Sequence, residues 1–304
     1  MITNLVPFVF GDADVLAELP DHFGDQVINK IPIGASLIEL TSVGDHHITQ
    51  LSPARFARLL NVANGVAYGG GMGMPEWVML DCALLPSFFA GFMGPTSLLS
   101  SFDCTLINTT LERVEAERSK ERCQVEQRLK VPQGSLVEEE WFPISEFCAL
   151  PRVTPHQIMG YSLYSLKRGL GVRAKAFGLW VWRSIGYEYQ VGVAQWSNLT
   201  AVRAHLRFGP LEILDPLTSM HTKAGETFIY RLLIPSSQTL VALIGQHHRS
   251  SQAHHTRPNP LEGTWRSIND LSWWLSHRET TTSKLFLYDV RNGQVGVEAL
   301  VVVS

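Results

Sequence analysis

Cysteine is scarce in this chain and never occurs in close pairs. The sequence holds no CxxC pair, and its four cysteines are widely spaced: Cys82, Cys104, Cys123 and Cys148. A disulfide framework or a zinc knuckle uses a denser cysteine pattern, so neither is expected. The pattern predicts a protein of the reducing cytoplasm.

Charged residues are also few. Only 17% of the residues are Asp, Glu, Lys or Arg, and the formal net charge is -3. Binding to a nucleic-acid backbone requires a concentrated positive field, so nucleic acid is not an expected partner. Hydrophobic residues make up 45% of the chain, which predicts a globular protein with a sizeable core.

Signals for secretion and for the membrane are weak. The apolar N-terminal stretch is short and lacks a basic n-region, which is atypical of a signal peptide. The strongest membrane candidate, Trp77–Gly94, contains Asp81 and Pro86. A membrane helix needs about 20 predominantly apolar residues. The run is therefore interpreted as a buried strand pair, and no membrane partner is expected.

Common catalytic motifs are missing: the chain has no G-x-S-x-G, H-E-x-x-H or Walker A pattern. Two histidine pairs, His247-His248 and His254-His255, lie between Ser, Gln, Arg and Pro residues without a nearby Asp, Glu or Cys. A zinc site needs convergent ligands. We therefore expect an exposed loop over 246–258 and no metal.

The remaining pattern predicts alternating helices and strands in three parts. Residues 1–130 are expected to form an N-terminal α+β region of unknown role, 131–245 a second module, and 246–304 a loop with a C-terminal hairpin. Ser52-Pro53 is typical of a helix start, here before Arg55–Tyr68, and Asn292-Gly293 of a hairpin turn within Leu285–Val303. Strands are expected at Ala35–Ser42, Val137–Ala149, Gln157–Ser165, Tyr189–Trp196, Leu211–Leu214, Thr227–Ile234 and Gln238–Gly245.

The segment Lys167–Gly209 carries the chemistry. A glycine-containing turn leads into a predicted helix, Val172–Ser184, with basic residues close by. Backbone N–H groups at a helix N-terminus, together with the helix dipole, favour a phosphate. We expect this turn to bind the diphosphate of coenzyme A through Arg168, Gly169, Leu170, Gly171, Val172 and Arg173.

The predicted strand Tyr189–Trp196 follows the helix. Val191 and Val193 lie on one side of it, and the small Gly192 and Ala194 on the other. The small residues would leave room for a pantetheine arm, and backbone N–H groups near Val191 and Val193 would hold the arm or polarise a carbonyl. Asn198 would cap the next helix and complete this cofactor site.

This segment resembles the GNAT superfamily, the Gcn5-related N-acetyltransferases, over residues 157–234, and the resemblance implies that 131–245 is an acyltransferase module. The family's glycine turn corresponds to Gly169 and Gly171, and its Asn and helix-ending Gly to Asn198 and Gly209, at the usual distances. The chain departs from the family at Leu166, which replaces Gln or Arg, and at Pro210.

The resemblance implies an α+β fold with a mixed, mainly antiparallel sheet flanked by helices. It also implies transfer of an acetyl or longer acyl group from acetyl-CoA or another acyl-CoA to an amine of a small molecule or protein. His205 stands where the family often has an acid tyrosine, and Glu146, within an apolar strand, is a candidate general base. A homodimer is a further expectation.

A weaker similarity links the chain to acyl-homoserine-lactone synthases, which share this fold and use acyl carrier protein as donor. It rests on Trp141–Phe147 and Phe208-Gly209-Pro210, but the family's arginine is missing after Ile144-Ser145-Glu146.

Two other readings stay open. A double hotdog fold, with a long helix from 156 to 185 followed by antiparallel strands, would be a thioesterase or dehydratase. A non-catalytic ligand-binding or scaffold protein with a transferase-like fold is the other. Two parallel strands that splay apart near Trp196 would favour the GNAT fold, whereas five continuous antiparallel strands after the helix would favour hotdog.

Overall fold

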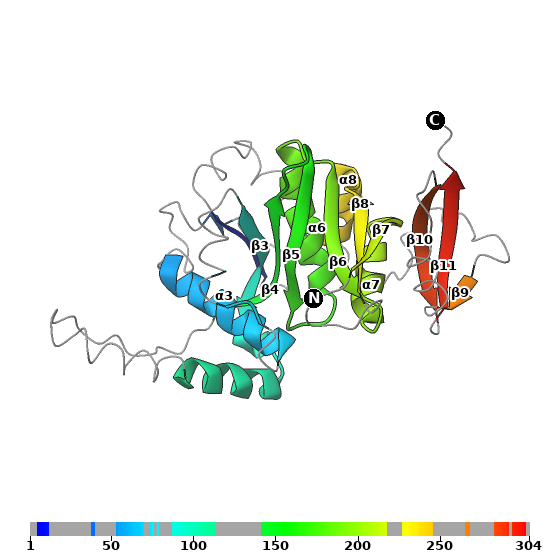
Figure 1. Ribbon diagram of the computed structural model, residues 1–304. Helices are drawn as coiled ribbons and strands as arrows, with labels where there is room; N and C mark the ends of the chain where they lie inside the picture. Colours follow the sequence, from blue (N-terminus) through cyan, green and yellow to red (C-terminus); the bar gives the residue numbers. More distant parts are fainter. Residues whose placement is uncertain are drawn as a thin grey trace.

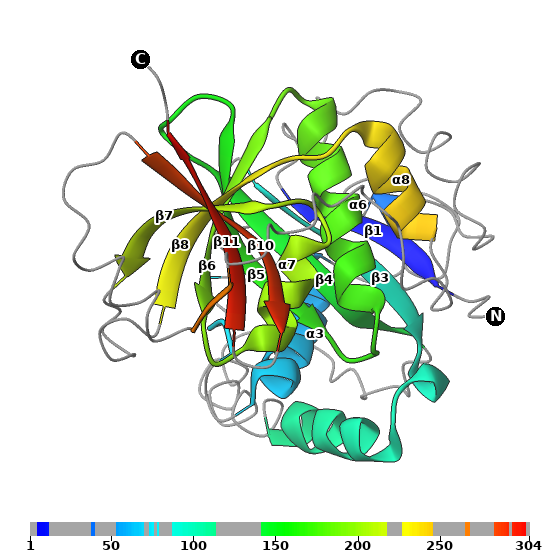
Figure 2. The same cartoon turned by 90° about the vertical axis from the view of Figure 1, so that its right-hand side faces the viewer.

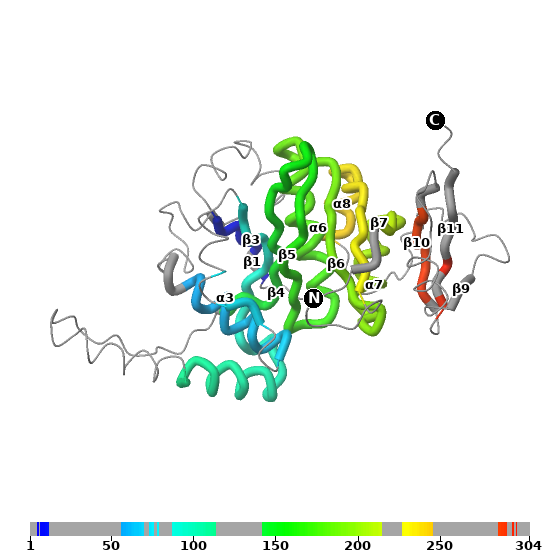
Figure 3. The backbone as a smooth tube through the Cα atoms, viewed as in Figure 1, coloured from blue at the N-terminus to red at the C-terminus, as the bar shows by residue number. Residues whose placement is uncertain are grey.

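The computed structural model describes residues 5–11, 38–39, 53–69, 73–75, 78, 87–113, 141–217, 227–245, 265–267, 283–291 and 294–301. Figure 1 labels most of the helices and strands, and Figure 3 follows the backbone of the described part in colour. The predicted histidine-rich loop 246–258 lies outside these residues, as does most of the predicted strand Ala35–Ser42.

The described strands form one mixed sheet in the order β2-β1-β3-β4-β5-β6-β8-β7-β10-β11-β9. Most neighbours are antiparallel; the parallel pairs are β1 with β2 and β5 with β6. The strands are β1 Val6–Gly11, β2 Ile38–Glu39, β3 Phe88–Pro95, β4 Trp141–Pro151, β5 Gln157–Ser165, β6 Tyr189–Gln195, β7 Leu211–Leu217, β8 Thr227–Leu233, β9 Trp265–Ser267, β10 Ser283–Arg291 and β11 Gln294–Val301.

Helices cover both faces of the sheet. They are α3 Pro53–Tyr68, α6 Leu170–Ser184, α7 Leu199–Leu206 and α8 Ser237–Gly245, with a short 3₁₀ turn at Thr96–Leu98 and a further helix over 101–113. Figure 1 shows α3 in front of the sheet and α6 behind it, and Figure 2 shows α6 and α8 side by side. We call these two faces the α3 face and the α6 face.

Alternation along the strands explains how two apolar layers form. In β3, Phe88 and Phe92 belong to the core that contains α6, whereas Phe89 and Met93 pack with Phe56 of α3. Successive strand residues point to opposite faces, so a continuous apolar run such as Phe88–Met93 fills both layers. The run predicted as a buried strand pair contains this strand; residues 79–86 are not described.

Helix α6 is the central helix of the fold. Eleven of its fifteen residues are buried, and the chain enters it through Gly169 in the left-handed region at φ 89°. A Cβ at Gly178 would collide with the ring of Phe147, so the helix lies close against β4. Glycine at this point permits the close approach that fixes the helix on the sheet.

The connection β5–α6–β6 decides between the two predicted folds. It joins two parallel strands, and α7 then separates β6 from β7. The mixed, mainly antiparallel GNAT-like fold is therefore confirmed. The double hotdog alternative is wrong, because Gln157–Ser165 is a strand rather than part of a long helix, and five uninterrupted antiparallel strands do not follow α6.

Most predicted elements are confirmed within about two residues. The predicted strand Gln238–Gly245 is wrong, because Ser237–Gly245 is helix α8. Ser236 caps this helix: its Oγ accepts a hydrogen bond from the N–H of Thr239 at 3.3 Å. Leu240, Leu243 and Ile244 are buried at helical spacing. Among the described helices, none is long and apolar enough to cross a membrane.

Candidate functional site

A wedge opens between β5 and β6. The two strands pair only over Gln157–Met159 and Tyr189–Val191, although β5 continues to Ser165 and β6 to Gln195. Beyond the paired part, the facing edges do not pair with each other, so their backbone N–H and C=O groups need other partners, such as a side chain or a ligand. We call this opening the wedge.

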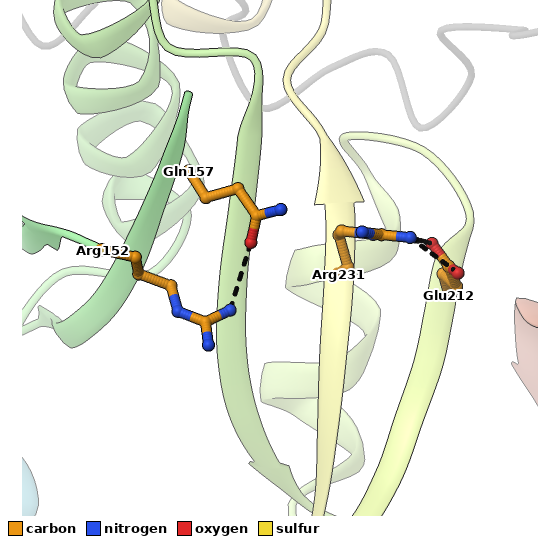
Figure 4. A network of polar contacts seen from close by, with 4 residues as sticks. All are labelled: Arg152, Gln157, Glu212 and Arg231. Atoms are coloured by element: carbon orange, nitrogen blue, oxygen red, sulfur yellow. Dashed lines mark hydrogen bonds and ion pairs between the residues drawn. The ribbon is translucent and has the colours of Figure 1, made fainter. Parts of the chain in front are cut away.

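Polar contacts brace the closed end of the wedge (Figure 4). Arg152 Nη1 donates to Oε1 of Gln157 at 3.1 Å, at the start of β5. On the neighbouring strands, Arg231 donates to both carboxylate oxygens of Glu212 at 2.8 and 2.9 Å, and its guanidinium lies 5.4 Å from the ring centre of Tyr189. The first contact joins the end of β4 to β5 and the second joins β8 to β7, so both support the strands beside the paired segment of β5 and β6.

The N-terminus of α6 stands at the open end of the wedge, because the helix follows directly on β5. The N-cap residue is Gly169, which contributes no side-chain cap. The N–H of Leu170 donates to the carbonyl of Lys167 at 3.1 Å, and Ser165 Oγ donates to the same carbonyl at 2.5 Å. Later N–H groups of the first turn point out of the helix end, as an anion site requires.

The residues predicted to bind the diphosphate divide into two groups. The turn brings together Arg168, Gly169, Leu170, Gly171 and Val172, and the Arg168 side chain is exposed. Arg173 points elsewhere: its Nε donates to the carbonyl of Ile244, at the end of α8, at 2.7 Å. Burial lowers the pKa of Arg173 to about 10. The structure thus gives this arginine a helix-capping contact away from the turn.

The strand β6 presents two different sides. Val191 is buried, and Val193 is 41% exposed. On the other side, the hydroxyl of Tyr230 occupies the space where Gly192 lacks a side chain, and it accepts a hydrogen bond from Gln190 Nε2 at 3.3 Å. The room that the sequence predicted for a pantetheine arm beside Gly192 therefore holds the side chain of Tyr230.

Asn198 and His205 belong to α7. Asn198 Oδ1 accepts a hydrogen bond from the N–H of Ala201 at 3.1 Å, so the predicted helix cap is confirmed. His205 is buried on the α6 face, where its Nδ1 lies 2.7 Å from Lys175 Nζ and its ring centre 5.0 Å from that of Tyr230. Burial lowers the pKa of His205 well below its usual range, and the neighbouring Lys175 adds to the effect.

Glu146 lies on the opposite face. It is fully buried in β4 and pairs across the sheet with Tyr164, whose side chain packs with α3. Burial raises the pKa of Tyr164 well above its usual range, and the charge of Glu146 adds to that rise. The two predicted proton-transfer residues, Glu146 and His205, are therefore separated by the sheet.

Tyr68 makes a contact at the wedge that the sequence pattern did not predict. From the end of α3, its hydroxyl donates to the carbonyl of Leu163 at 2.9 Å and accepts from the N–H of Leu163 at 3.2 Å. The neighbouring Asn64 donates to Ser162 Oγ at 2.9 Å. In the sequence, Tyr68 and the glycines after it mark only a helix end, so the pattern held no signal for a contact with a strand far along the chain.

Potential metal ligands do not gather in the described part of the chain: no group of three or more His, Cys, Asp or Glu side chains could hold an ion there. The buried His205 has the Lys175 nitrogen beside it rather than a carboxylate that could share a metal ion. The described site therefore consists of strand edges, a helix N-terminus and isolated polar side chains.

Similarity to known proteins is distant. No protein-family model and no curated protein matches the chain. Among solved structures, the ribosomal-protein-S18-alanine N-acetyltransferase from Escherichia coli is similar, with 9% identity and a TM-score of 0.37 over 59% of this chain and 88% of that one. A GCN5-related N-acetyltransferase from Brucella melitensis gives 13% identity and a TM-score of 0.37 over 64% and 76% of the two chains.

A third similar structure is a Salmonella typhimurium protein solved with acetyl-CoA. It is 10% identical, with a TM-score of 0.35 over 65% of this chain and 91% of that one. Identities and scores of this size carry no conclusion about this chain. The strand order and the β5–α6–β6 connection are what point to the GNAT fold.

Proposed function

We propose that this protein is an acyl-CoA-dependent acyltransferase that moves an acetyl or longer acyl group to an amine of a small molecule or protein. One observation carries the proposal: the parallel strands β5 and β6 open into a wedge directly beside the N-terminus of α6. A long, thin donor with a diphosphate at one end and a thioester at the other fits this combination. Its phosphates meet the helix end, and its arm enters between the strands.

The reaction needs few protein groups. The amine nitrogen attacks the thioester carbonyl, a C–N bond forms, the C–S bond breaks, and the amine loses a proton while the thiolate gains one. Backbone N–H groups on the open strand edges stabilise the oxyanion that develops on the carbonyl. Positioning both substrates in the wedge supplies much of the remaining rate enhancement.

Glu146 is the proposed general base. It lies on the α3 face beside Tyr164, one strand away from the open edge of β5. An amine that enters from the α3 face would approach this carboxylate, either directly or through a water molecule. His205 remains the proposed acid for the thiolate, although its Nδ1 contacts Lys175 in the core and its lowered pKa, caused by burial and by Lys175, works against this role.

A binding experiment tests the proposal first. Calorimetric titration with acetyl-CoA, a long-chain acyl-CoA and free CoA should give saturable binding with one site per chain. Transfer is then followed through release of the free thiol in the presence of a panel of amines. The absence of binding for all three compounds would contradict the donor assignment. Activity with acyl carrier protein as the only accepted donor would replace acyl-CoA in the donor assignment and leave the proposed acyl transfer to an amine unchanged.

A second candidate function is favoured by one observation. The sheet separates Glu146 from His205, so the two residues predicted to move protons do not face a common space. A non-catalytic acyl-CoA-binding or scaffold protein would tolerate this arrangement. Saturable binding without thiol release for any amine tested would select this candidate.

A further inference from the structure

The hydroxyl of Tyr68 occupies the strand edge that a thioester arm would use. We propose that Tyr68 is a built-in competitor of the arm: in the free protein its hydroxyl holds the N–H and C=O of Leu163, and the arm displaces it on binding. This inference rests on the proposed function and assigns a regulatory residue to the same site.

The backbone geometry places Leu163 on the open edge. The N–H of Leu166 donates to the carbonyl of Ile144 at 2.8 Å, toward β4. Successive residues of a strand direct their N–H and C=O groups to alternate sides. Leu163 therefore directs its groups away from β4 and into the wedge, where the Tyr68 hydroxyl binds both at 2.9 and 3.2 Å.

An arm with amide groups needs these same two groups. Pantetheine carries two amides, each with one N–H donor and one C=O acceptor, so it can pair with a free strand edge as an added strand does. A single phenol hydroxyl now satisfies both the donor and the acceptor of Leu163. The arm and the hydroxyl cannot hold them at the same time.

Tyr68 is placed where it can leave. It is the last residue of α3, and Gly69 follows it at φ 63°, in the left-handed region that ends helices. Tyr68 is 43% exposed, whereas Tyr164, on the neighbouring strand β5, is only 3% exposed. Rotation of Tyr68 toward solvent leaves the apolar core unchanged.

The phenol also stays protonated while it is bound. Burial raises the pKa of Tyr68, and the neighbouring Glu146 adds to the rise. The hydroxyl can therefore donate to the Leu163 carbonyl throughout the neutral pH range. The competition between the hydroxyl and the arm should therefore not change with pH across the neutral range.

The test compares hydroxyl deletion at Tyr68 with hydroxyl deletion at a matched tyrosine. Tyr164→Phe is the control, because its hydroxyl donates to the carbonyl of Pro143 at 3.2 Å, away from the wedge. Acetyl-CoA and free CoA are titrated calorimetrically into the wild type, Tyr68→Phe and Tyr164→Phe, after circular dichroism has shown that all three are folded. We expect Tyr68→Phe to bind about threefold to tenfold more tightly, the value of a hydrogen bond that no longer has to be broken. Tyr164→Phe should bind like the wild type.

The outcomes separate this inference from the proposed function. Equal or weaker binding by Tyr68→Phe, with a wild type that binds, overturns the competition and leaves the donor assignment intact. No binding by any of the three proteins overturns both. Amide hydrogen exchange adds a direct readout: in the free wild type the Leu163 N–H should exchange slowly, and acetyl-CoA should keep it protected in Tyr68→Phe as well.

Discussion

The Nζ of Lys175 lies 2.7 Å from Nδ1 of His205 inside the core. Both residues are buried, Lys175 completely, and the rings of Phe208 and Tyr230 lie 4.9 and 5.7 Å from the lysine nitrogen. Burial lowers the pKa of Lys175 well below its usual range, and burial together with Lys175 does the same for His205. In this contact one nitrogen donates to the other, and burial disfavours an additional proton on either side chain.

The first prediction concerns stability and pH. In the unfolded chain Lys175 and His205 take up protons near pH 10.5 and 6.5, whereas the folded state resists both. Above these pH values neither state binds the protons, so the two side chains do not lower the stability of the fold. As the pH falls below them, the unfolded chain binds the protons first, and the folded state loses stability until the lowered folded-state pKa values are reached. We expect the double variant Lys175→Met, His205→Leu to be more stable than the wild type by about 1–4 kcal/mol at pH 7.

Thermal unfolding at pH 5, 7 and 10 measures this effect. The double variant should exceed the wild type in Tm by the largest margin at pH 5 and by the smallest margin at pH 10. A difference in Tm that stays constant across this range would show that the two side chains do not titrate in the way their burial requires. The control is Lys167→Met, a half-buried lysine in the turn before α6.

The second prediction concerns His205 alone. His205→Ala removes the partner of Lys175 Nζ, so the Tm should fall by about 2–4 °C per kcal/mol lost. If the imidazole protonates the thiolate, kcat per folded molecule should also fall by about 100-fold, with acyl-CoA affinity unchanged. His205→Tyr should restore part of the rate. Unchanged turnover and an unchanged pH–rate profile would leave the histidine a structural role only.

The third prediction concerns the glycine turn. A Cβ at Gly171 would lie 3.3 Å from Cβ of Ser165, and the two further methyl groups of valine would crowd the helix end. Gly171→Val should therefore weaken CoA binding by about tenfold or more while the protein stays folded, because the backbone no longer admits the diphosphate. Gly65→Ala is the control, since a Cβ there meets open space. Unaltered CoA affinity in a folded Gly171→Val protein would remove the turn from the site.

The fourth prediction concerns Glu146. Glu146→Gln keeps the shape of the side chain and removes its ability to take a proton. We expect kcat/KM for an amine acceptor to fall by about 100-fold or more, with little change in the Kd for acetyl-CoA. The pKa of Tyr164 should fall at the same time, because the carboxylate charge contributes to its rise. A variant with full activity but a shifted tyrosine titration would assign Glu146 to structure alone.

Local sequence signals predicted the second half of the fold well, because glycines, prolines and capping residues mark where its helices and strands begin and end. Gln157–Ser165 was predicted residue for residue as a strand, and Asn198 was predicted as the cap of α7. The strand expected at Gln238–Gly245 failed because a short apolar run fits a strand and a buried helix equally well. The cap at Ser236 was the signal that distinguished them.

The direction of side chains on α6 could not be predicted in the same way. This helix is buried nearly all round, so its hydrophobic pattern does not show which side faces the turn, the sheet or a neighbouring helix. Arg173 therefore looked like a phosphate ligand, although it caps α8. The contact of Tyr68 with Leu163 depends on the packing of α3 across β5, which only the assembled fold defines.

The short pairing of β5 with β6 has a mechanical consequence. In the described part of the chain, the half of the sheet that contains β3, β4 and β5 meets the half that contains β6, β8 and β7 through three residue pairs and, beside them, through the carbonyl of His156, which accepts from the N–H groups of Glu188 and Tyr189 at 2.9 and 3.0 Å. Continuity between the halves runs instead through α6, which packs on β3, β4 and β5 and also against α8, the helix that follows β8. The helix that presents its N-terminus to the wedge is thus also the part that transmits cooperativity between the two halves during unfolding.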